Sequence, residues 1–108
     1  MGLFGKRQRA GTPRRADLVD RDHLRDWAET RVGVEAYLEP KTSVTEPTVM
    51  LIAHDGEWTR RRVPSPKHAF DLGRKLGIPV YDVAATGYPQ RMRDWTAARK
   101  AAGEQRSV

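Results

Sequence analysis

The 108-residue sequence contains no cysteine, and this absence removes several kinds of chemistry at once. Without thiols the chain has no disulfide, no cysteine nucleophile, no Cys-x-x-Cys redox pair and no cysteine-ligated metal centre. It also lacks any apolar run near the roughly 18 residues that a membrane-spanning helix requires. The charged N-terminal segment carries no apolar stretch of the kind that a secretory signal needs. We therefore expect a soluble, cytoplasmic protein.

The fingerprints of nucleotide-dependent enzymes are missing as well. Neither Gly-x-Gly-x-x-Gly nor Gly-x-x-x-x-Gly-Lys-Ser/Thr occurs, so no dinucleotide or P-loop site is indicated. The histidines, at positions 23, 54 and 68, are too far apart to show the spacing of metal ligands. We accordingly predict no catalytic residue, no metal site and no cofactor, and we favour a non-enzymatic function.

Acidic residues are missing from the N-terminal end. Residues 1–15 hold five basic side chains and no acid, residues 89–108 carry a net charge of +3, and residues 16–88 carry −2. The total of +6 therefore lies at the two ends, and basic ends attract phosphate groups with a strength that falls with salt. We predict a disordered basic arm over residues 1–16, a single domain over residues 17–95, and a helix end with a frayed tail over residues 96–108.

The apolar pattern predicts an α+β domain with the element order α-β-β-β-α-β-α and flexible basic termini. A mixed four-stranded sheet with packed helices follows, because the third and fourth strands are joined by a helix and should run parallel. The expected sheet order is third, second, first and fourth strand. The expected helices cover Asp20 or Asp22 to about Arg31, Pro66 to Leu76, and Pro89 to about Ala102, and the strands cover residues 34–39, 48–53, 57–63 and 78–85.

Residues 48–63 are the most informative segment, because they predict a β-hairpin. Asp55-Gly56 is a strong signal for a two-residue turn. Such a turn places Leu51 opposite Arg60, whereas a bulged turn would shift the register by one residue. Alternation along the return strand then puts three side chains on one face. They are Trp58, Arg60 and Arg62.

The order α-β-β-β-α-β over roughly residues 20–85 resembles the core of restriction-endonuclease-like nucleases. That family carries an acid on the middle strand and an (Asp/Glu)-x-Lys motif on the next, which together hold a divalent metal ion. Here the middle strand offers no acid, and Glu57-Trp58-Thr59 lacks the lysine. The resemblance therefore implies at most a relic nuclease, and Asp55 is better explained as a turn residue.

An aromatic side chain between arginines is typical of nucleic-acid binding. Guanidinium groups form paired hydrogen bonds with phosphate oxygens, and an indole can stack on an exposed base. The competing interpretation is that Glu35 and Glu39, on the first strand, neutralise the arginines as ordinary surface ion pairs. We favour a small basic module that binds nucleic acid or a ribonucleoprotein. The candidate binding residues are Lys6, Arg7, Arg9, Trp58, Arg60, Arg61, Arg62, Arg91 and Arg93.

The segment after the fourth strand offers a second interpretation. If Met92 and Trp95 dock on the sheet, their helix covers one face of the hairpin and presents Arg91 and Arg93 outward. If they do not dock, the segment is an exposed amphipathic helix that requires a partner. Met92 and Trp95 are therefore candidate partner-binding residues, and a protein-interaction or accessory subunit is the alternative function.

Four short stretches carry a family resemblance: residues 34–36, 55–62, 77–82 and 87–92. Together they resemble a family of short actinobacterial proteins of no established activity, some of which carry an oxidoreductase label. The resemblance implies no cofactor and no site residue. An oxidoreductase-like enzyme is a further alternative, but neither a cysteine nor a nucleotide fingerprint supports it.

Overall fold

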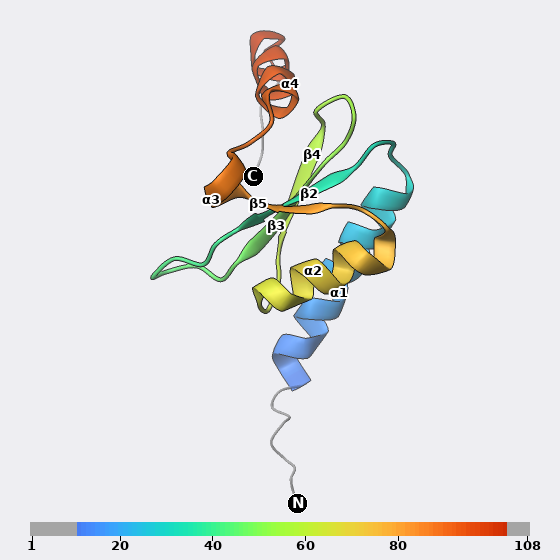
Figure 1. The fold of residues 1–108 in the computed structure, drawn as a ribbon, viewed down its shortest axis with the longest axis vertical. Coiled ribbons are helices and arrows are strands. Elements are labelled where there is room, and N and C mark those ends of the chain that lie inside the picture. The colour runs from blue at the N-terminus through green and yellow to red at the C-terminus, as the bar shows by residue number, and fades with distance from the viewer. Residues whose placement is uncertain (1–10, 104–108) are drawn as a thin grey trace, which may run out of the picture.

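The computed structural model describes residues 11–103, and the side chains from residue 19 onward. It confirms the α+β class and the predicted order of the main elements, with one short helix added after the last strand (Figure 1). The elements are α1 (Gly11–Glu29), β2 (Glu35–Glu39), β3 (Thr48–Ile52), β4 (Trp58–Arg62), α2 (Pro66–Leu76), β5 (Val80–Asp82), α3 (Val83–Thr86) and α4 (Gln90–Ala101). None of the described helices is long and apolar enough to span a membrane.

The four strands form one mixed sheet in the order β4-β3-β2-β5. Strand β3 runs antiparallel to both of its neighbours, and β5 runs parallel to β2. Strands β4 and β5 therefore point the same way, and both the predicted sheet order and this predicted parallel orientation are confirmed. Strand β4, with its arginines, lies at an edge of the sheet, as expected for a charged strand that must not pair with another chain.

Helices cover both faces of the sheet, which explains why β3 is apolar on both sides. Figure 1 shows α1 and α2 on one side, with α3 and α4 on the other. Because side chains alternate along a strand, Val49 and Leu51 pack into a core with α1 and α2, whereas Met50 and Ile52 pack with Met92 of α4. We call the side that bears Met50 and Ile52 the α4 face.

The predicted hairpin register is wrong by one residue. Residues 54–56 form a three-residue loop, in which the Ala53 amide donates to the Glu57 carbonyl over 2.8 Å. Arg60 therefore lies opposite Met50 rather than opposite Leu51. A shift of one residue moves side chains to the other face relative to β3, so Trp58, Arg60 and Arg62 lie on the α4 face.

The turn itself behaves as the sequence indicates. The Asp55 carboxylate accepts a hydrogen bond of 3.0 Å from the Glu57 amide, so the turn role expected for Asp55 is confirmed. Gly56 has a φ of +97°, a conformation that residues with a side chain rarely adopt. The loop thus depends on both residues of the Asp-Gly signal, although its length differs from the prediction.

Several element boundaries also differ from the prediction. Helix α1 begins at Gly11 rather than at Asp20 or Asp22 and ends at Glu29, so residues 11–16 of the predicted arm are helical. The rest of that arm, residues 1–10, and the predicted tail at 104–108 lie outside the described residues. The last strand ends at Asp82 because its carboxylate accepts a hydrogen bond of 2.9 Å from the Ala84 amide and caps α3.

Helix α2 packs closely on β5 through Gly73. A Cβ at this position would collide with the Val80 side chain and would lie 3.0 Å from the Ile78 carbonyl oxygen. Neighbouring Phe70 is 40% exposed, although the apolar pattern of the helix places it beside the buried Ala69. The close approach of helix and strand therefore depends on a residue without a side chain.

Replacing Gly73 by alanine is expected to lower the free energy of unfolding by about 1–2 kcal/mol. The collision destabilises the folded state by about 1–3 kcal/mol, and the better helix propensity of alanine offsets up to about 1 kcal/mol of this loss. Urea unfolding followed by circular dichroism measures the change, with Lys75→Ala on the exposed side of α2 as the control. A Gly73→Ala protein as stable as the control would contradict the close contact.

Candidate functional site

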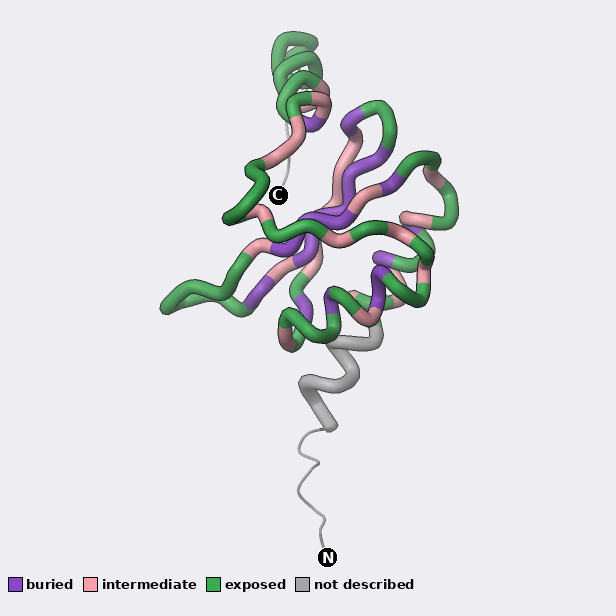
Figure 2. Tube along the Cα trace, viewed as in Figure 1, coloured by how far each residue is buried: buried purple, intermediate pink, exposed green. Residues whose placement is uncertain are grey.

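Helix α4 docks on the sheet through its first two turns only. Met92 is buried against Tyr37, Met50 and Ile52, and the Trp58 indole N–H donates a hydrogen bond of 2.9 Å to the Thr96 hydroxyl. Beyond these contacts the helix is exposed, as Figure 2 shows. The helix therefore leaves the sheet at an angle, and one of its sides overhangs the hairpin.

Arg91 ties the start of α4 to two strands. Its Nε donates to the Ala53 carbonyl over 3.0 Å, and its guanidinium contacts a Glu35 carboxylate oxygen at 2.6 Å. The Tyr37 hydroxyl donates to the same oxygen over 3.0 Å. Burial, followed by this hydrogen bond to Glu35, raises the pKa of Tyr37. Arg91 was predicted to face outward, but it anchors the helix instead.

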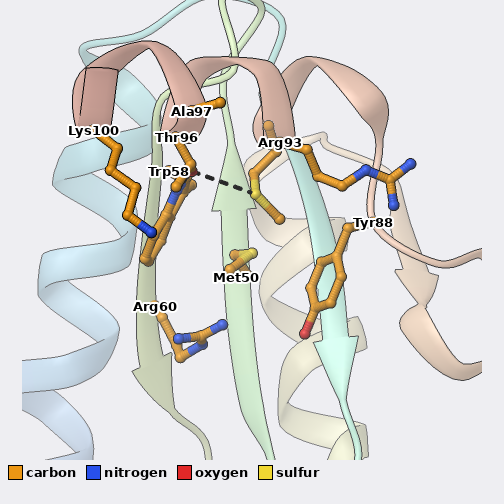
Figure 3. Close-up of a pocket in the computed structure, with 9 residues that line it drawn as sticks. Met50, Trp58, Arg60, Tyr88, Arg93, Thr96, Ala97 and Lys100 are labelled. Atoms are coloured by element: carbon orange, nitrogen blue, oxygen red, sulfur yellow. Dashed lines mark hydrogen bonds between the residues drawn. The ribbon is translucent and has the colours of Figure 1, made fainter. Parts of the chain in front are cut away.

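A groove of about 480 Å³ lies between the overhanging side of α4 and the α4 face of the hairpin. Figure 3 shows Trp58 and Tyr88 on opposite sides of this groove, with Met50 between them and α4 above. Two aromatic rings and three basic side chains thus share one depression. The lining residues are Met50, Trp58, Arg60, Tyr88, Met92, Arg93, Thr96, Ala97 and Lys100.

Glu39 accepts hydrogen bonds from two residues that line the groove, Arg60 and Tyr88, and from Thr48. Arg60 donates to its two carboxylate oxygens over 2.7 and 2.9 Å, Thr48 donates over 2.6 Å, and the Tyr88 hydroxyl donates as well. Burial alone would raise the pKa of Glu39, but the hydrogen bonds from Arg60, Thr48 and Tyr88 outweigh it and leave this pKa below its usual value. The Arg60–Glu39 pair confirms the competing interpretation for this arginine, whereas Glu35 pairs with Arg91.

Two cations of α4 that line the groove, Arg93 and Lys100, differ from Arg60 in forming no ion pair within residues 19–103. Arg93 is exposed and donates to the Gln90 side chain over 3.0 Å, and Lys100 is exposed. Within residues 19–103 neither forms an ion pair, and neither does the exposed Arg62 farther along the same face. The positive charges of Arg93 and Lys100 at the groove are therefore not neutralised by an ion pair within the described residues.

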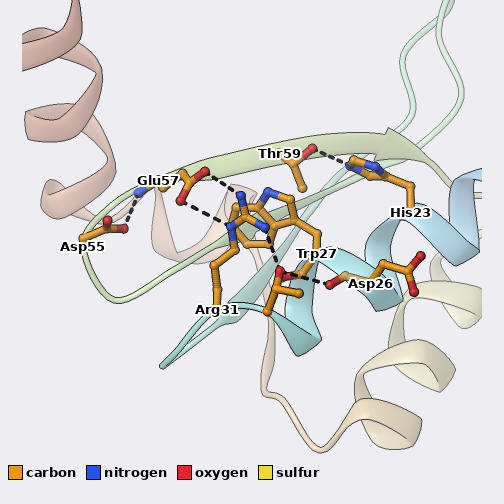
Figure 4. A network of polar contacts seen from close by, with 8 residues as sticks. His23, Asp26, Trp27, Arg31, Asp55, Glu57 and Thr59 are labelled. Carbon is orange, nitrogen blue, oxygen red and sulfur yellow. Dashed lines mark hydrogen bonds and ion pairs between the residues drawn. The ribbon is translucent and has the colours of Figure 1, made fainter.

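Arg61 lies on the opposite face of the sheet, because alternate residues of β4 point to opposite sides. It contacts Asp20 of α1 at 3.6 Å, and its guanidinium approaches Nδ1 of His23 at 3.4 Å. Because arginine only donates, Nδ1 accepts and Nε2 of His23 donates to the Thr59 hydroxyl over 2.8 Å (Figure 4). Burial, followed by the charge of Arg61, lowers the pKa of His23. In this arrangement both ring nitrogens of His23 are engaged, and neither is free to take the hydroxyl proton of Thr59. Arg61 points away from the groove and does not line it.

A second polar cluster on that side, also drawn in Figure 4, stabilises the end of α1. Arg31 pairs with Glu57 at 2.8 Å, and its guanidinium lies 4.3 Å from the ring centre of Trp27. Trp27 is 8% exposed and belongs to the core. This cluster joins α1 to the hairpin.

Only some of the predicted nucleic-acid-binding residues line the groove. Trp58, Arg60 and Arg93 line it, and Arg62 lies on the same face, whereas Lys6, Arg7 and Arg9 lie outside the described residues. Met92 and Trp95 help to dock α4: Trp95 is half-buried next to Gly56, and Arg99 lies 4.9 Å from its ring centre. Their predicted binding of a partner protein remains a prediction.

Sequence reasoning missed Tyr88 and Lys100. Arg93, Thr96, Ala97 and Lys100 follow the i, i+3, i+4, i+7 spacing of a single helix side, so this spacing could have identified Lys100. Tyr88 gave no such signal, because its place in the groove depends on where the chain turns after α3.

Among the residues that the structure describes, no three His, Asp or Glu side chains gather as metal ligands would. No protein family matches the chain, and neither a curated protein nor a solved structure is significantly similar to it. The resemblance to short actinobacterial proteins therefore stays a prediction.

Proposed function

We propose that this domain is a non-enzymatic module that binds nucleic acid, alone or within a ribonucleoprotein, through the groove under α4. The observation that carries the proposal is the joint lining of this groove by Trp58 and Tyr88 with Arg60, Arg93 and Lys100. Aromatic rings supply stacking surfaces for bases, and a positively charged groove follows the phosphate backbone. This combination is typical of nucleic-acid sites.

The charges of the groove have separate roles. Arg60 is paired with Glu39, which also accepts a hydrogen bond from Tyr88, and its guanidinium lies 5.3 Å from the ring centre of Trp58. It therefore positions the aromatic rings more than it attracts phosphate. Arg93 and Lys100 are exposed and have no ion pair in the described part of the chain, so they supply the attraction. The basic N-terminal residues of the sequence add a salt-sensitive attraction that needs no defined contact.

Removing Arg93 and Lys100, the two cations of α4 that line the groove, is expected to weaken binding and to reduce its salt dependence. In the variant Arg93→Gln with Lys100→Gln, the slope of log affinity against log salt should fall by about 1.4, because each phosphate contact with a single strand contributes about 0.7. Fluorescence anisotropy with labelled RNA and DNA strands, at several salt concentrations and with the full chain, measures this slope.

The matched control removes two exposed lysines that lie elsewhere. Lys41 is in the loop between β2 and β3, and Lys75 is on α2, on the opposite face. Lys41→Gln with Lys75→Gln changes the net charge equally, and we expect a smaller change in slope. Equal effects of the two double variants, or no binding of the full chain at low salt, would overturn the proposal.

A further inference from the structure

We infer that the groove holds one unpaired nucleobase between the rings of Trp58 and Tyr88, so that the partner is a single strand. The inference rests on the proposed function and narrows its substrate class. The two rings lie on either side of Met50, whose side chain contributes to the apolar floor (Figure 3). The Arg60 guanidinium borders this floor, 5.3 Å from the ring centre of Trp58. An apolar floor flanked by two aromatic rings matches the hydrophobic faces of a base.

Both rings are held in place before any ligand enters. The Trp58 indole N–H is bonded to Thr96 of α4, and the Tyr88 hydroxyl is bonded to Glu39 of β2. Because each ring is anchored by its polar end, neither has to be ordered when a ligand arrives. Binding sites that are organised in advance lose less conformational entropy on binding. The arrangement thus favours insertion of a flat ring.

The size of the groove favours a single unpaired base over a duplex. Its volume of about 480 Å³ lies within the roughly 300–1,000 Å³ of sites for small molecules. A duplex keeps its base faces stacked inside the helix and offers only base edges in its grooves. Stacking on Trp58 and Tyr88 therefore requires a base that has left its stack, as single-stranded partners allow.

The cations of α4 fit the phosphates of such a strand. Arg93 and Lys100 lie on one side of the helix, seven residues apart, which corresponds to about 10 Å along its axis. Both line the groove under α4, and the two aromatic rings line it below them. A nucleotide whose base occupies the groove thus has a cation available for a phosphate on each side.

The test compares DNA strands of equal length and charge with and without bases, and a duplex, using the full chain at one salt concentration. We expect the base-bearing single strand to bind on the order of tenfold more tightly than the abasic strand. Tyr88→Leu should remove this preference, whereas Tyr88→Phe, which keeps the ring, should retain it. Circular dichroism verifies that both variants are folded.

The outcomes separate the two proposals. Equal affinity of the wild-type chain for abasic and base-bearing strands would overturn the base site and leave the proposed function standing. Tighter binding of the duplex than of the single strand would likewise overturn only the base site. Failure to bind any of the three at low salt would overturn both. The wild-type comparison decides the question even if Tyr88→Leu does not fold.

Discussion

Replacing Gly56 by alanine is expected to detach α4 from the sheet and to lower the free energy of unfolding by about 2–4 kcal/mol. A Cβ at this position would collide with the Arg91 carbonyl and would lie 2.8 Å from the Cβ of Trp95. Alanine would also have to adopt the φ of +97°. Because the colliding atoms belong to the first two turns of α4, the helix has to move.

Gly77→Ala is the matched control for this experiment. Gly77 also has a positive φ, of 71°, but no atom lies within 4 Å of the place where its Cβ would be. It should therefore cost only the conformational strain, about 1 kcal/mol. Urea unfolding measures both variants, and hydrogen exchange of the α4 amides reports whether the helix has detached. Equal losses in the two variants, with unchanged exchange in α4, would show that the contact at Gly56 does not hold the helix.

Glu39→Gln should cost about 2 kcal/mol of stability at neutral pH, because charge-assisted hydrogen bonds contribute about 1.5–3 kcal/mol. The variant leaves Arg60 without its ion pair and weakens the anchor of Tyr88. Thermal unfolding measures this loss.

The pH dependence of this variant gives an independent readout. The folded-state pKa of Glu39 lies below its usual value of 4.5, so its contribution to stability is present above that pH and is lost as the pH falls through the folded value. The wild-type chain should therefore lose more stability on acidification below pH 4.5 than Glu39→Gln does. Glu46→Gln in an exposed loop is the control. Identical acid profiles for wild type and Glu39→Gln would contradict the role assigned to Glu39.

The sheet could be predicted from sequence, because local signals determine it. A continuous apolar run such as residues 49–53 is typical of a central strand covered on both faces, and arginines followed by a proline are typical of an edge strand. The register could not be predicted, because an Asp-Gly pair suits both two-residue and three-residue loops. Gly56 packs against Arg91 and Trp95 of α4, a contact far along the chain that the local sequence does not reveal.

The candidate site, like the sheet, could be predicted from the sequence only in part. Trp58 and Arg60 share a face through simple alternation, so their proximity was predictable in either register. The same alternation accounts for Arg61, which points to the other face and contacts Asp20. Arg91 was expected to face outward, yet it is engaged by Glu35. This difference depends on how α4 packs on the sheet, which the local sequence does not reveal.

The most direct test of the nucleic-acid groove is a nuclear magnetic resonance titration that follows the indole N–H signals of the three tryptophans with a short DNA single strand. Trp58 lines the groove, Trp27 lies in the core on the opposite face, and Trp95 lies beside the hairpin loop. We predict a saturable shift of the Trp58 signal, with Trp27 unchanged. A shift confined to Trp27 or Trp95, or no shift at low salt, would contradict the assignment of this groove as a nucleic-acid site.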